Sequence, residues 1–193
     1  MRRSLAIVTV LFLMTAVSFG QSQKWQIDPA HSAAQFSVRH LGISTVRGQF
    51  DKVAGTVIYN AADPSKTSID ATIDAASVNT RVEMRDKDVR SPNFLDTAKY
   101  PTITFKSKKT ETAGTGKLKV TGDLTLHGTT KEVVLDVQGP SQAIKDPFGD
   151  GQRTGASAST KISRKDFGVN GAAGMVSDEI EITLDIEMTG PEK

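Results

Sequence analysis

The chain has 193 residues, no cysteine and three histidines, and 24 Lys and Arg residues face 22 Asp and Glu residues. Without cysteine the protein has no disulfides, no thiolate chemistry and no cysteine-ligated zinc site. A net charge of +2 provides no basic surface for phosphate backbones, so no nucleic-acid partner is expected.

Residues 1–20 have the features of a secretory signal peptide. Two arginines precede an apolar run, Leu5–Leu13, and the small residues Ser18 and Gly20 follow. This run is far short of the roughly 20 apolar residues that span a membrane, so no membrane-spanning segment is expected. We expect export by the general or the twin-arginine route. The mature chain, residues 21–193, then forms one soluble domain with no net formal charge.

Alternation of apolar and polar residues predicts about eight β-strands. In chain order the predicted strands are 34–40, 55–59, 69–75, 102–107, 118–126, 133–137, 156–163 and 179–188. The pair His127-Gly128 predicts a hairpin turn between two of them. One face of nearly every strand is polar, which indicates antiparallel strands with one side in water rather than a doubly wound parallel sheet.

The apolar face of these strands has to be buried, either in a two-sheet sandwich or in a closed barrel. At about eight strands, a barrel is wide enough to hold one small ligand. Small residues occupy many inward positions, among them Ala34, Ala71, Ala156 and Ala158. They leave a cavity unless long side chains from opposite strands meet them, and alternation alone leaves both alternatives open.

One charged segment, between Thr80 and Leu95, is predicted to be helical and to cover an end of the barrel. Thr80 and Glu83 have the spacing of a capping box. Glycine-rich stretches at 149–155 and 168–174 predict long loops that could form a rim.

The three histidines, His31, His40 and His127, have no metal-ligand spacing, so no metal site is expected. Asp28, His31 and Ser32 are not accompanied by a nucleophile elbow or an oxyanion-hole pattern, so we expect no catalytic residues and no enzyme.

Arg85, Asp86 and Arg90 form a cluster on the predicted helix. Two guanidinium groups near a barrel mouth could hold an anionic or carbonyl-bearing head group. The alternative is that the cluster forms ordinary solvated ion pairs.

A series of short motifs resembles, in order, those of the YceI-like, polyisoprenoid-binding periplasmic proteins. The motifs are DPAHS at 28–32, FSVRHL at 36–41, GQF at 48–50, SVNT at 77–80, RD at 85–86, RSPNF at 90–94, KYPTITF at 99–105, GDLTLHG at 122–128 and RKDFG at 164–168. Together they span nearly all of the mature chain.

The resemblance implies an all-β, lipocalin-like up-and-down barrel that binds a long isoprenoid, of the quinone or polyprenyl type, in its interior. It also implies no cofactor, no covalent chemistry, a periplasmic location and frequent homodimers. Asp88-Val89 stands where the family pattern usually has histidine and leucine. A carboxylate there disfavours a pyrophosphate head group and favours a neutral one.

Alternation and the resemblance together predict the ligand-binding residues. They are Phe36, Val38, His40, Ile73, Arg85, Asp86, Arg90, Phe94, Ile103, Phe105, Leu124, Leu126 and Ile182. The expected function is a non-catalytic periplasmic carrier of a long-chain isoprenoid or a similar amphiphilic lipid. The alternative is an envelope barrel with a structural or protein-interaction role and no bound lipid.

Overall fold

A computed structural model describes residues 22–191 of the chain. The expected signal peptide lies outside the described residues. The strands are β1 (Gln23–Ile27), β2 (Ala33–His40), β3 (Ser44–Phe50), β4 (Val53–Tyr59), β5 (Ser68–Asp74), β6 (Val78–Asn79), β7 (Thr102–Thr112), β8 (Lys117–Leu126), β9 (Thr129–Gln138), β10 (Ile144–Lys145), β11 (Gln152–Ser163) and β12 (Glu179–Gly190). The helices are α1 (Glu83–Arg90) and the 3-10 turns η1 (Pro64–Lys66), η2 (Ala75–Ser77) and η3 (Arg164–Phe167).

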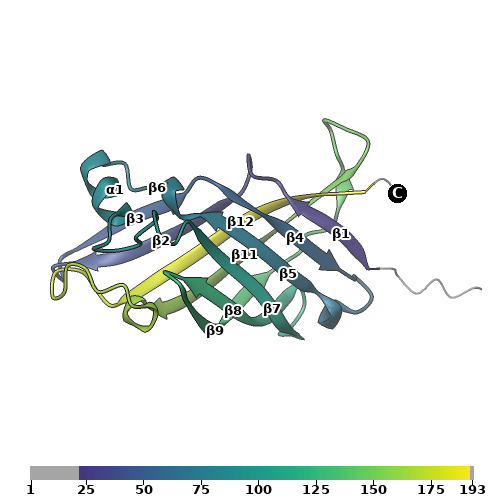
Figure 1. Ribbon diagram of the computed structural model, residues 1–193. Helices are drawn as coiled ribbons and strands as arrows, with labels where there is room; N and C mark the ends of the chain where they lie inside the picture. Colours follow the sequence, from purple (N-terminus) through teal and green to yellow (C-terminus); the bar gives the residue numbers. More distant parts are fainter. Residues whose placement is uncertain (1–21, 192–193) are drawn as a thin grey trace, which may run out of the picture.

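These strands close into an eight-stranded antiparallel barrel. Three of its sides consist of two strands joined by a short bend: β1 with β2, β3 with β4, and β5 with β6. The other sides are β7, β8, β9, β11 and β12, and the pairing of β11 with β12 closes the ring. Figure 1 shows the resulting elongated barrel. The predicted all-β, up-and-down barrel is confirmed, and each predicted strand lies on a different side.

The hairpin predicted at His127-Gly128 is confirmed. His127 and Gly128 have φ angles of 51° and 72°, and Leu126 pairs with Thr129 across the turn. Positive φ at both central residues gives a turn whose twist matches that of the strands. The local sequence therefore fixes the register between β8 and β9.

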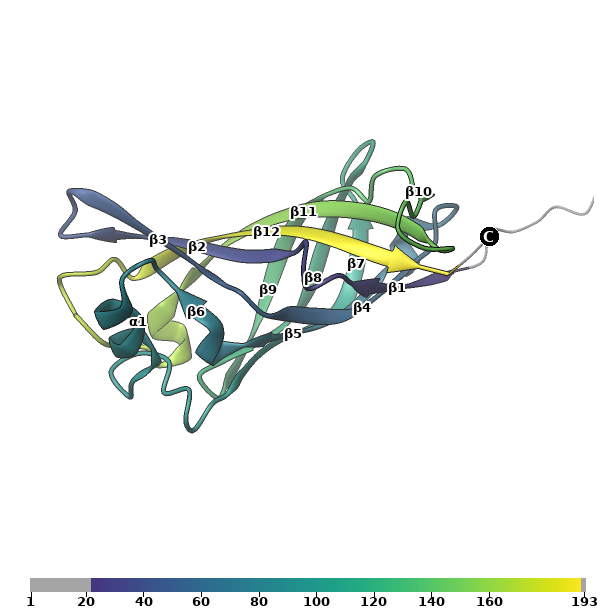
Figure 2. The ribbon, with the colours of Figure 1, turned by 90° about the horizontal axis from the view of Figure 1, so that it is seen from above.

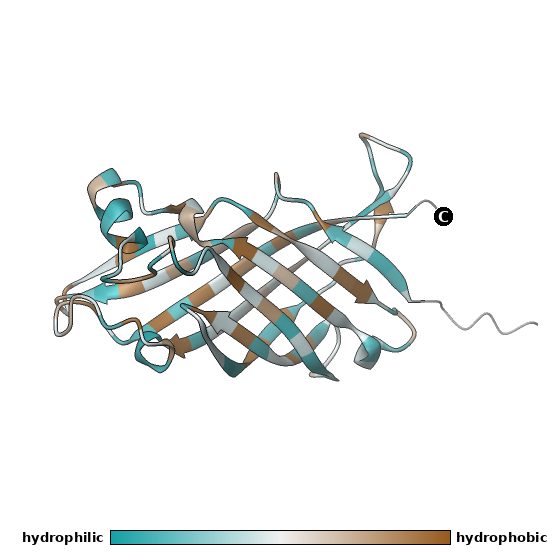
Figure 3. Cartoon of the chain, in the orientation of Figure 1, coloured by the Kyte–Doolittle hydropathy of each residue, from teal (hydrophilic) through white to brown (hydrophobic). Residues whose placement is uncertain are grey.

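Hydrophobic and hydrophilic residues alternate along the strands, as the banded ribbons of Figure 3 show, and successive side chains of a strand point to opposite faces. On β12, Ile182 pairs with Phe36 of β2 and with Thr160 of β11. On the outer side, Lys161 forms ion pairs with Glu179 and Glu181 at 2.9 and 3.0 Å. The barrel is therefore apolar inside and charged outside.

The helix lies within the expected segment, but the capping box is wrong. The N-cap residue of α1 is Val82, whose apolar side chain forms no capping hydrogen bond. Thr80 instead donates from Oγ1 to Asp86 Oδ1 at 2.5 Å. The loop expected at 149–155 is also shorter, because β11 begins at Gln152.

The two ends of the barrel differ. In both ribbon views α1, the β2–β3 turn and the loop before β12 lie at one end, and β10 lies at the other (Figures 1 and 2). We call these the α1 end and the β10 end. Within residues 22–191, no helix combines the length and the apolar character needed to cross a bilayer.

Candidate functional site: the barrel cavity

The barrel encloses a cavity of ≈ 470 Å³ whose wall is formed by every side of the barrel. This volume lies within the range of roughly 300–1,000 Å³ that is typical of small-molecule sites. Inward apolar side chains such as Ile182, Leu184 and Ile186 of β12 are only half-buried, because they face the cavity rather than other side chains. From the sequence alone, an interior filled by side chains was also possible. The structure has a cavity instead.

Small residues keep the cavity open. Ala71, Ala156 and Ala158 line it, as the sequence suggested. Glycine contributes in a second way, since a Cβ built on Gly48 would lie 2.5 Å from Cζ of Phe36. The ring of Phe36 therefore lies against the wall in the space that a side chain at position 48 would fill.

Most of the predicted ligand-binding residues lie in the cavity wall. They are Phe36, Val38, His40, Ile73, Arg85, Phe94, Ile103, Phe105, Leu124, Leu126 and Ile182. Their contact with a ligand stays a prediction.

Asp86 and Arg90 are not part of the cavity wall, which corrects the placement inferred from the sequence. Asp86 is buried and accepts a hydrogen bond from Thr80 N at 2.7 Å. Arg90 donates to the carbonyl oxygens of Ala76 and Val78 at 3.0 and 3.1 Å. Both side chains fasten α1 to the chain segment before it, because they satisfy backbone groups that would otherwise lose their partners.

The ionisable groups of the wall lie at the α1 end. His40, Arg85 and Asp88 all contribute to the lining there. Arg85 is held by two hydrogen bonds to Thr80, from Nε to Oγ1 and from Nη2 to the carbonyl oxygen, each 2.7 Å. Asp88 accepts from Asn93 Nδ2 at 3.0 Å. The cavity thus combines a long apolar wall with one polar end.

Arg164 organises the loop before β12, and sequence reasoning missed it as a site residue. It is 2% exposed and lines the cavity. Its guanidinium donates to the carbonyl oxygens of Val169 (2.9 Å), Gly171 (2.7 Å) and Ser177 (3.0 Å). A signal was present, because position 164 continues the inward alternation of Ile162, where an arginine can be buried only with several acceptors.

Apolar packing fills the barrel toward the β10 end. Trp25 and Met188 are each 2% exposed and belong to one core cluster. The Trp25 ring lies over Gly190, where a Cβ would come within 2.5 Å of ring carbons. The ionisable residues of the cavity wall and this apolar packing therefore lie at opposite ends.

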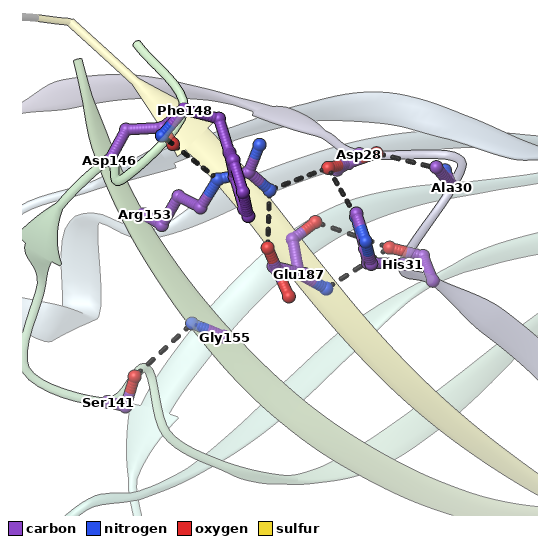
Figure 4. Close-up of polar contacts among 10 residues, drawn as sticks. Asp28, Ala30, His31, Ser141, Asp146, Phe148, Arg153, Gly155 and Glu187 are labelled. Carbon is purple, nitrogen blue, oxygen red and sulfur yellow. Dashed lines mark hydrogen bonds and ion pairs between the residues drawn. The ribbon is translucent and has the colours of Figure 1, made fainter. Parts of the chain in front are cut away.

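A cluster of charged side chains stands outside the cavity, around Arg153 (Figure 4). Arg153 forms ion pairs with Asp28 at 2.7 Å, with Asp146 at 2.9 Å, and with Glu187. Hydrogen bonds from His31 and Arg153 hold the pKa of Asp28 well below its usual value, and the carboxylates raise the pKa of Arg153 further. Ligand atoms of Asp28, His31 and Glu187 lie within 4.8 Å of one another, but the guanidinium already supplies the cation that these carboxylates need.

Comparison with known proteins agrees with this architecture. Protein YceI of Escherichia coli O157:H7 is 36% identical over 189 residues, which cover 97% of each chain. The crystal structure of Campylobacter jejuni YCEI protein is 34% identical and superposes with a TM-score of 0.70, over 80% of this chain and 90% of that one. A polyisoprenoid binding domain from Saccharophagus degradans has the same fold at 19% identity, with a TM-score of 0.64 over 86% of this chain and 98% of that one. Residues 25–188 match the YceI-like domain, and the chain belongs to the YceI-like family.

Proposed function

We propose that the protein is a non-catalytic periplasmic carrier that holds a long-chain isoprenoid, or a similar amphiphilic lipid of the quinone or polyprenyl type, inside the barrel. The observation that carries this proposal is the apolar cavity of ≈ 470 Å³, whose wall side chains keep accessible surface inside a closed barrel. Leaving such apolar surface without a partner is costly, and a hydrocarbon chain removes the cost.

The length of the cavity favours a tail rather than a compact ligand. Its wall includes Val176 near the α1 end and Pro140 after β9 toward the other end. Each buried CH₂ group contributes about 0.8 kcal/mol gross, and the lost freedom of the ligand offsets much of this gain. Tail length therefore sets the affinity, and the polar end sets the orientation.

The polar lining favours a head group near Arg85 and His40 at the α1 end. A guanidinium offers donors to a carbonyl or hydroxyl oxygen, and Asp88 beside it disfavours a group with several negative charges. A quinone-like head group fits this combination better than a pyrophosphate. The likeness to the polyisoprenoid binding domain from Saccharophagus degradans supports the same ligand class.

The periplasmic location is supported by the leader sequence of residues 1–20. The ligand would be held by burial of its tail and by the polar groups at the α1 end, without a cofactor.

Native mass spectrometry of the protein purified from the cell envelope, followed by solvent extraction and lipid identification, tests the proposal. We expect one isoprenoid lipid per barrel. Ala158→Phe, which fills the cavity, should lower the lipid content, and Ser159→Phe on the outer face of the same strand is the control. An empty wild-type protein that also takes up no added quinone or polyprenol would reject the carrier and favour an interaction barrel.

A further inference from the structure

Exposed apolar side chains gather at the α1 end of the barrel. Five large ones are exposed there: Leu41 (53%), Ile43 (79%), Val82 (46%), Met84 (83%) and Met175 (51%). They come from the β2–β3 turn, the start of α1 and the loop before β12, which Figure 2 shows together at this end. We refer to these five residues as the apolar rim.

Backbone contacts join the segments that carry the rim. Leu41 N donates to the carbonyl oxygen of Met175 at 2.7 Å. A Cβ on Gly171 of the loop would lie 2.2 Å from the carbonyl oxygen of Asn93, in the segment that follows α1. The rim is therefore carried by one connected structure at this end of the barrel.

The same segments also line the cavity. His40 before the turn, Val89 on α1 and Val176 in the loop are all part of its wall. The exposed rim and the polar end of the cavity are thus built from neighbouring residues of the same three segments. A surface that contacts the rim lies next to this end of the cavity.

The segments that carry the apolar rim also have basic side chains that form no salt bridge with any described residue. Arg39, Arg81 and Lys87 are exposed, and in residues 22–191 none of them forms a salt bridge. Among these residues, the Arg39 guanidinium donates only to neutral groups of its own hairpin, Thr45 Oγ1 and the carbonyl oxygen of Gly42. Of the acidic groups beside them, Glu83 pairs with Arg90 at 3.5 Å, and Asp88 accepts from Asn93 and keeps its charge. Apolar side chains next to unpaired cations are the composition of a surface that binds anionic lipid head groups.

We propose that the apolar rim docks on the surface of an anionic phospholipid bilayer and that the barrel loads and releases its ligand there. This inference rests on the proposed function, because a ligand with a long apolar tail is stored in membranes. Contact at the rim lets the tail pass between the bilayer and the cavity without crossing water.

Vesicle flotation tests the proposal with protein exported by cells that express the full chain. The probes are vesicles of phosphatidylethanolamine with phosphatidylglycerol, and vesicles of phosphatidylcholine alone. The rim variant is Ile43→Ser with Met84→Ser, two exposed residues outside the cavity wall. The matched control is Ile144→Ser with Phe148→Ser, two residues near β10 that are 61% and 82% exposed.

Wild type and control should float with the anionic vesicles, and the rim variant should bind about tenfold more weakly, because two side chains no longer enter the bilayer. Absence of flotation by the wild type, equal loss in both variants, or equal binding to neutral vesicles would overturn the proposal. A rim variant that changes from dimer to monomer while no form floats would overturn it too, in favour of self-association.

The lipid content of the same preparations separates this inference from the carrier function. A lipid-filled wild type that does not float rejects bilayer docking and leaves the carrier in place. An empty wild type that floats through its rim rejects the carrier and retains the docking surface.

Discussion

Nη1 of Arg153 donates a 2.7 Å hydrogen bond to Oδ2 of Asp28, a residue 125 positions earlier in the chain. Asp28 lies in the bend between β1 and β2, and Arg153 lies on β11, the strand that closes the barrel against β12. Glu187 of β12 accepts from the same guanidinium. One arginine therefore ties the bend in the first side of the barrel to the closing pair of strands.

Asp28→Asn should change how stability depends on pH. Hydrogen bonds from His31 and Arg153 lower the pKa of Asp28 in the folded protein below its usual 3.8. The unfolded chain then binds more protons in acid, so this contribution is present above the usual pKa and is lost as the pH falls through and below it.

Urea unfolding at a series of pH values measures the effect. The wild type should lose free energy of unfolding more steeply than Asp28→Asn from about pH 5 downward. Asp146, whose pKa is also lowered, shares Arg153 with Asp28 and is influenced by its charge, so the same comparison is repeated in an Asp146→Asn background. Parallel curves would contradict the role given to Asp28.

Gly48→Ala should destabilise the barrel by about 1–2 kcal/mol, because the new methyl group overlaps the Phe36 ring, which then has to move into the cavity. Removing the ring relieves this part of the conflict and leaves the contact with Cγ2 of Thr80 at 2.9 Å. Phe36→Leu should therefore cost less in the Gly48→Ala background than in the wild type, as measured by thermal unfolding of all four proteins. Additive costs would show that the ring does not depend on Gly48.

Arg164→Met should lower the free energy of unfolding by about 3 kcal/mol, because it leaves several buried carbonyl oxygens without a donor. Amide exchange of residues 168–176 should accelerate more than that of β8 and β9. The comparison is made by hydrogen–deuterium exchange with mass spectrometry. Uniform acceleration over the whole barrel would contradict a local role for Arg164 in this loop.

Arg85→Met tests contact with the ligand. Arg90→Met tests the hydrogen bonds that attach α1 to the carbonyl oxygens of Ala76 and Val78. Arg85 lines the cavity and Arg90 does not. Arg85→Met should weaken binding of a quinone-type lipid about tenfold, the loss expected when a charged donor is removed. Arg90→Met should leave the affinity unchanged and reduce stability by about 1 kcal/mol. A reversed pattern, measured by binding titration and thermal unfolding, would place the head group elsewhere.

The barrel was predictable because apolar and polar residues alternate along most of its strands and one turn is encoded by His127-Gly128. The sequence-based prediction assigned no strand to β1 or β3. In β3, Gly48 interrupts the apolar alternation, and its inward position becomes understandable only once Phe36 is seen to lie over it. The predicted number of sides was still right, since β1 and β3 extend sides that already contain β2 and β4.

The candidate site was predictable where alternation decides the direction of a side chain. Ile73 and Ile182 are such residues, and both line the cavity. The period-two alternation of strands does not tell which side chains of a helix face the cavity. It therefore could not distinguish Arg85, which lines the cavity, from Asp86 and Arg90, which do not. Asp86 turns to Thr80, a partner whose position depends on the tertiary fold and not on local spacing.

The most direct test of the carrier is the affinity for a series of isoprenoid quinones that share one head group and differ in tail length. If the tail lies in the cavity, the affinity rises with each added isoprene unit until the cavity is filled. In Ala158→Phe the affinity stops rising at a shorter tail. An affinity that does not depend on tail length, or a series that is identical in wild type and Ala158→Phe, would contradict the binding of a lipid inside the barrel.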